Sequence, residues 1–242
     1  MDGFSYYDIF ATKGLEYLII IAFLALLVPF SIALNKQVKI GTRIQKALGI
    51  LSASMLKIPQ GLFYSNNHTW MYMEKSGAAA IGLDDLLLHI TGEVKFTSLK
   101  KPGEMISKGE LLTEIDQNGK LLSIFSPVSG KILSTNSLLS ERTEVLNEDP
   151  YGKGWIYKIK PTNWIAEIKS CYFADDATNW SANELLRFKD FLATTMKSCS
   201  PETSMVVLQD GGELSDHTLA SLPEEIWKDF QKEFLNLYRL PV

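Results

Sequence analysis

Residues 111–136 read LLTEIDQNGKLLSIFSPVSGKILSTN, and three short apolar runs follow one another within them. The first two runs are separated by Asn118-Gly119, and the second and third by a turn-rich segment from Ser126 to Gly130. Asn-Gly is typical of a two-residue type I′ turn, because both central residues of that turn need a positive φ. The stretch therefore predicts a tight β-hairpin followed by a further strand.

The same pattern of short apolar runs continues upstream. The runs include TWMYM at residues 69–73, AAAIG at residues 78–82 and EVKFTSL at residues 93–99, and turn signals such as KSG and KKPG separate them. Strands of this length at this spacing are typical of an all-β sandwich or barrel. The sequence therefore predicts a mainly β domain in the middle of the chain.

Three longer strings within this domain are specific. His68-Thr69-Trp70 precedes the first runs, SPVSGKI spans residues 126–132, and NEDPYGKGW spans residues 147–155. Over about residues 58–193 the chain resembles the glycine cleavage system H protein family. The resemblance implies a mainly β barrel-sandwich hybrid with flanking helices. It also implies a protein that is not an enzyme, whose lipoyl-lysine at a hairpin tip carries an aminomethyl group between enzymes.

The lysine of this chain does not match that motif. The family's motif is E-S-V-K-A, and an ungapped count back from Ser126 puts Asp116 at its glutamate and Gly119 at its lysine. Lys120 comes one position late, with Gln117 instead of an acid three residues before it. Successive strand side chains point to opposite faces, so this shift moves the amine to the other face. We therefore predict no cofactor, with lipoate on Lys120 as the alternative.

An apolar run, LEYLIIIAFLALLVPFSIAL, occupies residues 15–34. About 20 such residues cross a hydrocarbon core of about 30 Å. The side before the run is mostly acidic, and the side after it carries Lys36, Lys39, Arg43 and Lys46. By the positive-inside rule, the later part of the chain lies in the cytoplasm. We predict a non-cytoplasmic tail over residues 1–14 and a single transmembrane helix over residues 15–35 in the inner membrane; a cleaved signal peptide would need a basic start and a small-residue cleavage site.

Residues 36–57 show apolar positions at helical spacing and predict an amphipathic linker helix. Its apolar face would lie on the membrane surface or a partner, or would pack on the following domain. That H-protein-like domain is expected to span residues 58–195.

Residues 196–242 depart from the family and predict a docking extension. Just before it, a helix is expected to begin at Ser181, with Glu184 completing a capping box. The extension itself predicts a strand over residues 204–209 and an amphipathic helix over residues 222–238. About 40 residues do not bury a core alone, so this segment must dock within the chain or on a partner. Its candidate interface anchors are Trp227, Phe230, Phe234 and Tyr238.

The composition excludes several classes of function. The net charge of −4 and the absence of a basic stripe speak against nucleic-acid binding. Cys171 and Cys199 are isolated, and the three histidines form no metal-ligand pattern. No phosphate-binding loop or nucleophile elbow occurs. His68 and the acidic pair Glu148-Asp149 suit structural roles better than catalysis.

We therefore expect a non-catalytic, membrane-anchored H-protein-like subunit. It would act as a structural and interaction component of a membrane-bound redox or respiratory complex, bound to the other subunits and to the bilayer through residues 15–35. The alternative is a membrane-tethered lipoyl carrier with its arm on Lys120. A periplasmic efflux adaptor is disfavoured, because that class inserts a long helical hairpin where this chain has only QNG.

Overall fold

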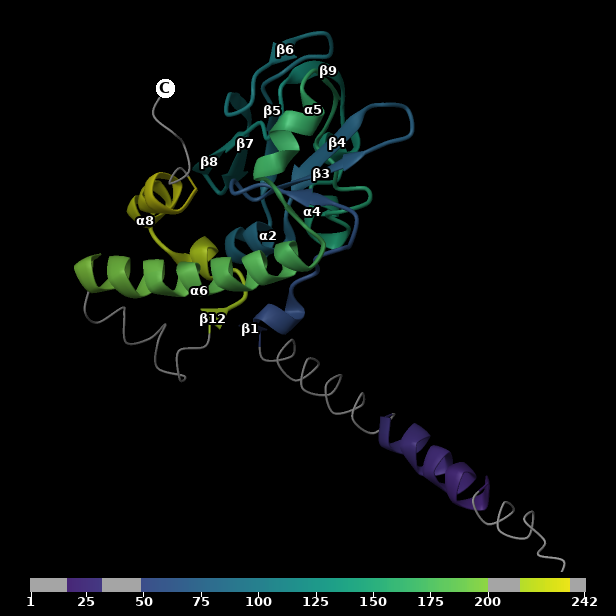
Figure 1. The fold of residues 1–242 in the computed structure, drawn as a ribbon. Coiled ribbons are helices and arrows are strands. Elements are labelled where there is room, and N and C mark those ends of the chain that lie inside the picture. Colours follow the sequence, from purple (N-terminus) through teal and green to yellow (C-terminus); the bar gives the residue numbers. More distant parts are fainter. Residues whose placement is uncertain (1–16, 32–48, 200–213, 236–242) are drawn as a thin grey trace, which may run out of the picture. The chain divides into compact units, whose positions relative to one another are not determined.

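A computed structural model describes residues 17–31, 49–199 and 214–235 of the 242-residue chain (Figure 1). The chain forms two compact units, Met1–Ala47 and Leu48–Val242. In the first unit, residues 17–31 form a helix whose apolar side chains are exposed. Among the described residues, no helix combines the length and the apolarity that a membrane crossing needs. The predicted transmembrane helix over residues 15–35 is therefore not confirmed, and the predicted tail over residues 1–14 lies outside the described residues.

The predicted linker helix does not extend through residue 57. Residues 36–48 lie outside the described part of the chain, and after them Ile50–Leu51 form strand β1 and Ala53–Met55 form the short 3-10 helix η1. Gly49 has a φ of 67°, in the left-handed region, which the residues of a right-handed helix do not adopt. Leu51, one of the apolar positions in this segment, is buried in the main core.

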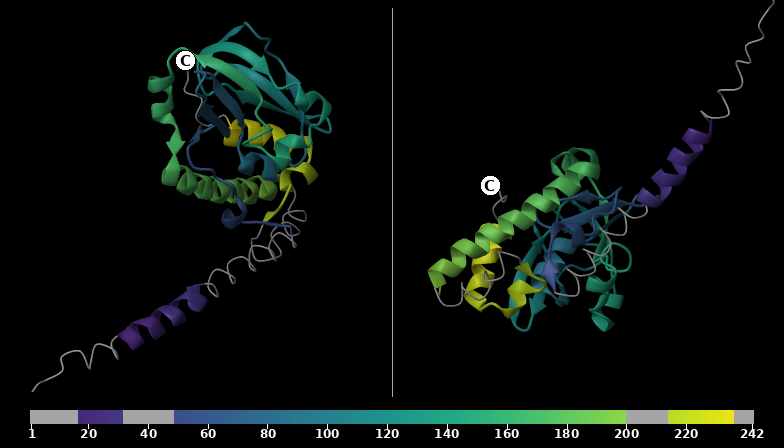
Figure 2. Two further views of the ribbon diagram at one scale, coloured as in Figure 1. Left: turned by 90° about the vertical axis from the view of Figure 1, so that its right-hand side faces the viewer. Right: turned by 90° about the horizontal axis from the view of Figure 1, so that it is seen from below.

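The second unit is a mainly β sandwich with flanking helices, as predicted (Figure 2). One sheet has seven antiparallel strands in the order β11-β2-β3-β4-β10-β9-β6, and the other has three in the order β5-β7-β8. The strands of the larger sheet are β2 (Phe63–Tyr64), β3 (Thr69–Met73), β4 (Ala79–Leu83), β6 (Met105–Ile106), β9 (Gly130–Thr135), β10 (Tyr157–Pro161) and β11 (Tyr172–Phe173). The smaller sheet contains β5 (Lys95–Ser98), β7 (Leu111–Gln117) and β8 (Lys120–Phe125).

A third, two-stranded sheet joins distant parts of the chain. Strand β1 pairs antiparallel with β12 (Leu214–Ser215), with Leu51 opposite Leu214. The remaining elements are helical: α2 (Asp85–Thr91), α3 (Leu138–Glu141), α4 (Val145–Glu148), α5 (Trp164–Glu167), η2 (Ile168–Ser170), α6 (Ala174–Cys199), η3 (Thr218–Ser221), α8 (Glu224–Asp229) and the π-helical turn η4 (Phe230–Leu235).

The larger of two buried apolar clusters includes side chains of the C-terminal extension. Inward-facing side chains of both sheets, such as Met71, Ile115 and Ile132, belong to the same buried cluster as Trp227 and Phe230. Burial of such apolar area is the main stabilising contribution to the fold. The extension is therefore part of the folded domain.

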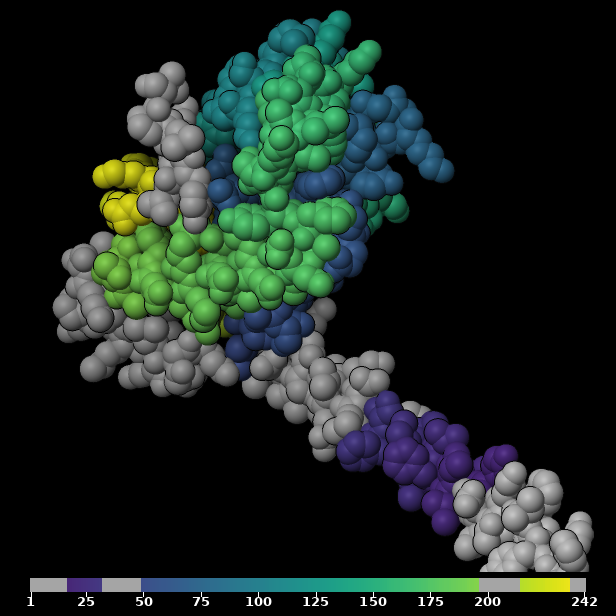
Figure 3. Space-filling model, in the orientation of Figure 1, coloured from purple at the N-terminus to yellow at the C-terminus, as the bar shows by residue number. Residues whose placement is uncertain are grey.

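The long helix α6 begins earlier than the sequence predicts. It starts at Ala174, seven residues before the predicted N-cap Ser181, and its first turn carries Asp175 and Asp176, whose charges favour a helix N-terminus. Ser181 lies inside the helix and is buried, and Glu184 forms an ion pair with Arg187 instead of a capping box. The helix also crosses the predicted domain boundary at residue 195. In the space-filling view it forms a ridge across one face of the domain, beside the yellow C-terminal residues (Figure 3).

The string NEDPYG forms the predicted turn. The carboxylate of Asp149 accepts hydrogen bonds from the backbone N–H groups of Gly152 and Lys153. The indole Nε1 of Trp70 donates to the carbonyl oxygen of Pro150 at 3.0 Å. Asp149 thus shapes this loop, and Trp70 of β3 binds the loop to the larger sheet.

Candidate functional site

The hairpin of β7 and β8 has the predicted two-residue turn. Gln117 and Lys120 face each other as the last cross-strand pair. Asn118 and Gly119 have φ values of 53° and 88°, which are the positive values that a type I′ turn requires. The carboxylate of Asp116 accepts a hydrogen bond from Gly119 N at 2.6 Å. Glycine thus occupies the tip, and Lys120 is the first residue of the following strand.

The amine of Lys120 is bound by the C-terminal extension. Its Nζ donates to the carbonyl oxygens of Ala220 at 2.7 Å and Leu222 at 3.0 Å. It also lies 5.2 Å from the centroid of a Trp227 ring, within the range of a cation–π interaction. The Trp227 indole donates to Leu219 O at 2.8 Å, which fixes the ring beside the same short helix, η3. Two carbonyl oxygens and an aromatic face therefore surround this half-buried amine.

A glutamine of the extension covers the neighbouring backbone. Strand β8 is at the edge of its sheet, so its outward N–H and C=O groups need partners. Ser123 N donates to the side-chain oxygen of Gln231 at 2.7 Å, and the Gln231 amide nitrogen donates to Ser123 O at 3.3 Å. One primary amide thus satisfies both backbone groups, as a neighbouring strand would.

His89 of α2 forms a second contact with the extension, at Asp216. Its Nδ1 lies 2.8 Å from Asp216 and its Nε2 lies 3.4 Å from Asp85. Burial alone lowers the pKa of His89, but hydrogen bonds and charge interactions with Asp216 and Asp85 outweigh burial and raise it to about 9. The imidazole is therefore charged at neutral pH and links α2 to the residues after β12.

His68 is a buried structural residue, as expected, and it joins the barrel to α6. Its Nδ1 lies 2.8 Å from Asp84, its Nε2 lies 3.4 Å from Glu184, and the ring stacks on Phe234 at 5.3 Å. Burial lowers the pKa of His68, but Asp84 and Glu184 together raise it to about 9. Arg187 pairs with Glu184 and lies over the Phe234 ring. The site is an ion-pair network between packed elements, with no open face for a substrate.

The comparisons with known proteins agree with this architecture. The family described as Glycine cleavage H-protein matches residues 62–182, which is half of the chain. The chain belongs to this family. A probable glycine cleavage system H protein from Thermococcus kodakarensis is 35% identical over 113 residues, covering 47% of this chain and 84% of the relative. The corresponding protein of Psychrobacter cryohalolentis is 30% identical over 125 residues, covering 52% and 98%.

A solved structure is also similar to this H-protein-like domain. The crystal structure of a glycine cleavage system H protein from Mycobacterium marinum matches with a TM-score of 0.41 and 27% sequence identity. The match covers 43% of this chain and 87% of that one.

The amine beside the hairpin turn is already engaged within the chain. The ungapped count from Ser126 predicts the family's lysine position at Gly119. The amine of Lys120 donates to Ala220 O and Leu222 O. An amide at Nζ would remove the positive charge and would leave one N–H donor instead of three, although the present contacts use two. Loading of Lys120 would therefore require the amine to leave both carbonyl oxygens.

Three of the four predicted interface anchors are buried inside the H-protein-like unit. Trp227, Phe230 and Phe234 are each at most 1% exposed. Phe230 and Phe234 pack against Phe188 of α6, with ring centroids 5.7 and 5.8 Å apart. These side chains leave no surface for a partner, because the sandwich and α6 provide the apolar contacts that they need. Tyr238, like the predicted strand over residues 204–209, lies outside the described residues.

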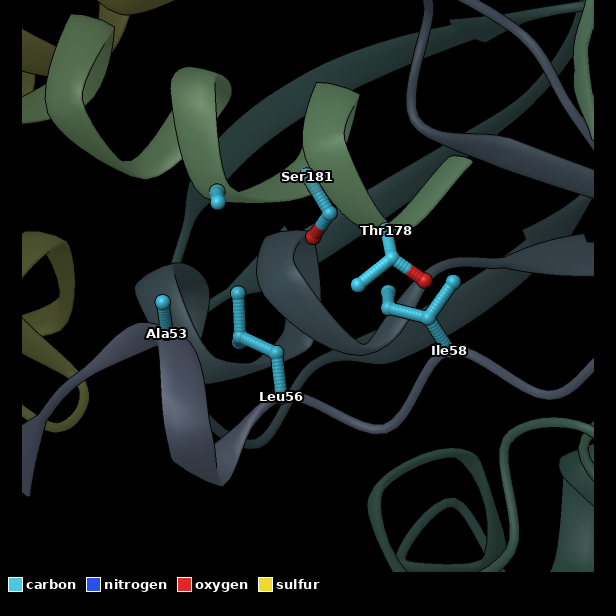
Figure 4. A pocket seen from close by; sticks show the side chains of 6 residues that line it. Ala53, Leu56, Ile58, Thr178 and Ser181 are labelled. Atoms are coloured by element: carbon cyan, nitrogen blue, oxygen red, sulfur yellow. The ribbon is translucent and has the colours of Figure 1, made fainter. Parts of the chain in front are cut away.

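A small pocket lies between η1 and α6 (Figure 4). Its volume is about 190 Å³, and its lining residues are Ala53, Leu56, Ile58, Thr178, Ser181 and Ala182. It contains no charged side chain. Within the described ranges, no group of histidine, cysteine, aspartate and glutamate residues could hold a metal ion. The hairpin therefore remains the candidate functional site.

The sequence located the hairpin but not what covers it. None of these contacts carries a sequence motif. His89 and Asp216 are 127 residues apart in the chain, and Gln231 and Ser123 are 108 residues apart. The only sequence signal for the contact of His89 with Asp216 is that an extension of this size must dock on another part of the protein or on a partner.

Proposed function

We propose that this chain is an H-protein-like subunit without a lipoyl arm, and that it serves as a structural component of a membrane-bound complex. The observation that supports this most directly is the binding of Lys120 Nζ by two carbonyl oxygens of the same chain. A swinging arm depends on a mobile tether that keeps its reactive end near successive active sites. An amine that holds a domain together is not suited to that task.

The domain without an arm retains a rigid sandwich and its surface. A role in holding subunits together needs nothing more, and it agrees with the family resemblance, which implies a carrier rather than a catalyst. We propose that the partners are other subunits of a redox or respiratory complex. The support is the combination of a family fold, a displaced lysine and an apolar N-terminal run in one chain.

We also propose that residues 15–35 anchor the chain in the inner membrane, with the H-protein-like domain in the cytoplasm. The support is the apolar run and the basic residues that follow it. Two measurements test this. The protein should stay with membranes during alkaline extraction, and the domain should resist protease added to intact cells. Digestion of the domain from outside would reverse the proposed orientation.

The second candidate is a membrane-tethered lipoyl carrier with its arm on Lys120. Membership of the H-protein family favours it, and so does the position of Lys120 directly after the hairpin turn. In this case the extension would have to release Lys120 before loading, and a lysine-modifying enzyme would have to accept Gln117 in place of the acidic residue.

The intact mass of the chain separates the two candidates. The protein would be purified from its native membranes in mild detergent, with co-purifying proteins retained. An unmodified mass with stoichiometric membrane subunits supports the structural role. A mass increased by one lipoyl group that maps to Lys120 contradicts it. As a second arm, Lys120→Arg keeps the positive charge, so complex assembly should persist under the structural role, whereas a carrier would lose its activity.

A further inference from the structure

The segment from Leu214 to Leu235 encloses the amine that lies closest to the family's modification site. We propose that this segment is a built-in cap, which closes the β7–β8 hairpin and shields Lys120 from lysine acylation. The inference rests on the proposed function, because it gives a physical reason for a hairpin without an arm. It concerns the chemical accessibility of one amine, which can be measured independently of any partner.

The first support is the coordination of the amine itself. An ammonium group has three N–H donors and no acceptor. Ala220 O and Leu222 O take two of these donors, and the Trp227 ring lies on the same group. Acylation needs the neutral amine with its lone pair directed at the acyl carbon. The ammonium must therefore lose a proton and leave both carbonyl oxygens before it can react.

The second support is that the cap does not depend on Lys120 alone. The Gln231 amide pairs with the backbone of Ser123, three residues along the same strand. The guanidinium of Arg187 donates to Phe234 O at 3.1 and 3.2 Å and lies 3.8 Å from the centroid of that ring. Contacts of Gln231 and Arg187 therefore help to hold the segment in place beside Lys120.

The third support is that the cap occupies the edge that an incoming protein would need. An enzyme that reads a hairpin must approach its tip and the strands beside it. The outward backbone of Ser123 is paired, and α8 packs along β8. The cap thus leaves Asn118 and Gly119 exposed but covers the side of the hairpin on which the Lys120 amine lies.

Pulsed acetylation of the full-length, unmodified chain tests the cap. A water-soluble N-hydroxysuccinimide ester transfers its acetyl group to the neutral amine: the new C–N bond replaces the ester C–O bond, and a proton is released to solvent. Peptide mass spectrometry then gives a rate for each lysine. Exposed Lys131 and Lys160 serve as internal references. We expect Lys120 to react at least about tenfold more slowly than either, since it reacts only while the cap is locally open.

Two variants on one helical segment provide the matched comparison. Gln231→Ala removes both bonds to Ser123 and should speed the acetylation of Lys120 several-fold. Lys228→Ala removes a 72% exposed side chain that pairs only locally with Glu224, and it should leave the Lys120 rate unchanged. Circular dichroism of both variants verifies that the domain is folded, and the unmutated chain by itself still decides the question if Gln231→Ala does not fold.

The outcomes separate this inference from the proposed function. Reaction of Lys120 as fast as Lys131 and Lys160 in the unmutated chain overturns the cap, even if the native protein carries no arm. Slow reaction that Gln231→Ala does not accelerate also overturns it, because the protection would then come from the hairpin alone. A lipoyl group on Lys120 of the native protein overturns the proposed function, whatever the acetylation rates of the unmodified chain.

Discussion

At the scale of single residues, one turn determines where the lysine lies. Asn118 and Gly119 both have positive φ, so the hairpin closes in two residues and Lys120 becomes a strand residue opposite Gln117. The side chain of a strand residue has a fixed direction, and here that direction leads to the carbonyl oxygens of the extension. The two-residue turn thus decides on which strand position, and beside which groups, the amine lies.

Replacement of the turn glycine tests this geometry. Gly119→Ala should lower the free energy of unfolding by about 1 kcal/mol or more, because a side chain at a φ of 88° is strained. Asn118→Gly is the opposite control and should change stability little, since glycine accepts a φ of 53° without strain. Urea unfolding followed by fluorescence measures both. An equal effect of the two substitutions would contradict the type I′ assignment.

Removal of the Lys120 amine tests its role as an anchor. Lys120→Met leaves Ala220 O and Leu222 O without their donor, and we expect a loss of about 1–3 kcal/mol in the free energy of unfolding. Lys131→Met, on an exposed strand position, should cost less than about 0.5 kcal/mol. Hydrogen exchange should become faster over residues 214–235 in the first variant only. Unchanged exchange there would show that the amine does not hold the extension.

At the scale of elements, two charged histidines join segments that are distant in sequence. His89 links α2 to Asp216, and His68 lies between Asp84 and Glu184 of α6. Both pKa values are raised to about 9, although burial opposes this, because two carboxylates flank each ring. The docking of helices against the sandwich is therefore coupled to proton binding.

This coupling predicts a stability that falls at alkaline pH. Each histidine has a folded-state pKa of about 9, above its ordinary value of 6.5. The folded state therefore binds the proton more tightly, and the stabilisation is complete below pH 6.5 and is lost as the pH rises through 9. The loss should reach up to about 3 kcal/mol per histidine, with screening reducing it at His89. Chemical unfolding at a series of pH values from 6 to 10 measures it.

Neutralising one partner should flatten this profile. Asp216→Asn removes a charge that raises the pKa of His89, so the variant should lose less stability between pH 6.5 and 9 than the unmutated protein does. An identical slope in both proteins would mean that His89 does not contribute to the pH dependence.

At the scale of the whole molecule, the extension is part of the main buried cluster. Leu219, Trp227, Phe230 and Phe234 belong to the same buried cluster as the inner faces of both sheets. The predicted alternative in which these side chains reach a partner therefore does not describe this fold. The family's sandwich has been enlarged by a segment that packs on α6 and β8.

Truncation tests the unity of this core. Deletion of residues 200–242 removes three large buried aromatic side chains, each worth about 3–5 kcal/mol, from a domain whose total stability is typically about 5–15 kcal/mol. The shortened protein should lose its cooperative thermal transition in calorimetry. Deletion of residues 236–242 keeps all of these contacts and should retain the transition. A shortened protein that melts cooperatively near the full-length temperature would show that the sandwich folds alone.

Much of the sandwich could be predicted from the sequence, but little of how α6 and the C-terminal extension pack on it. The Asn118-Gly119 turn and the NEDPYG loop depend on the backbone preferences and local hydrogen bonds of their own residues, so the sequence alone indicates their structure. The start of α6 was missed because Ser181 imitates an N-cap while packing decides where the helix begins. The contact of Lys120 with Ala220 spans 100 residues and uses a backbone oxygen, which leaves no trace in the sequence.

The pairing of β1 with β12 has a mechanical consequence. The second unit begins at Leu48, and two residues later the chain enters this two-residue ladder, with Ile50 opposite Ser215 and Leu51 opposite Leu214. Tension that reaches the domain along the preceding chain is therefore borne first by this short ladder and only afterwards by the larger sheets. Because β12 leads directly to Asp216 and η3, a pull on the residues that precede β1 would strain the C-terminal segment before any other part of the domain.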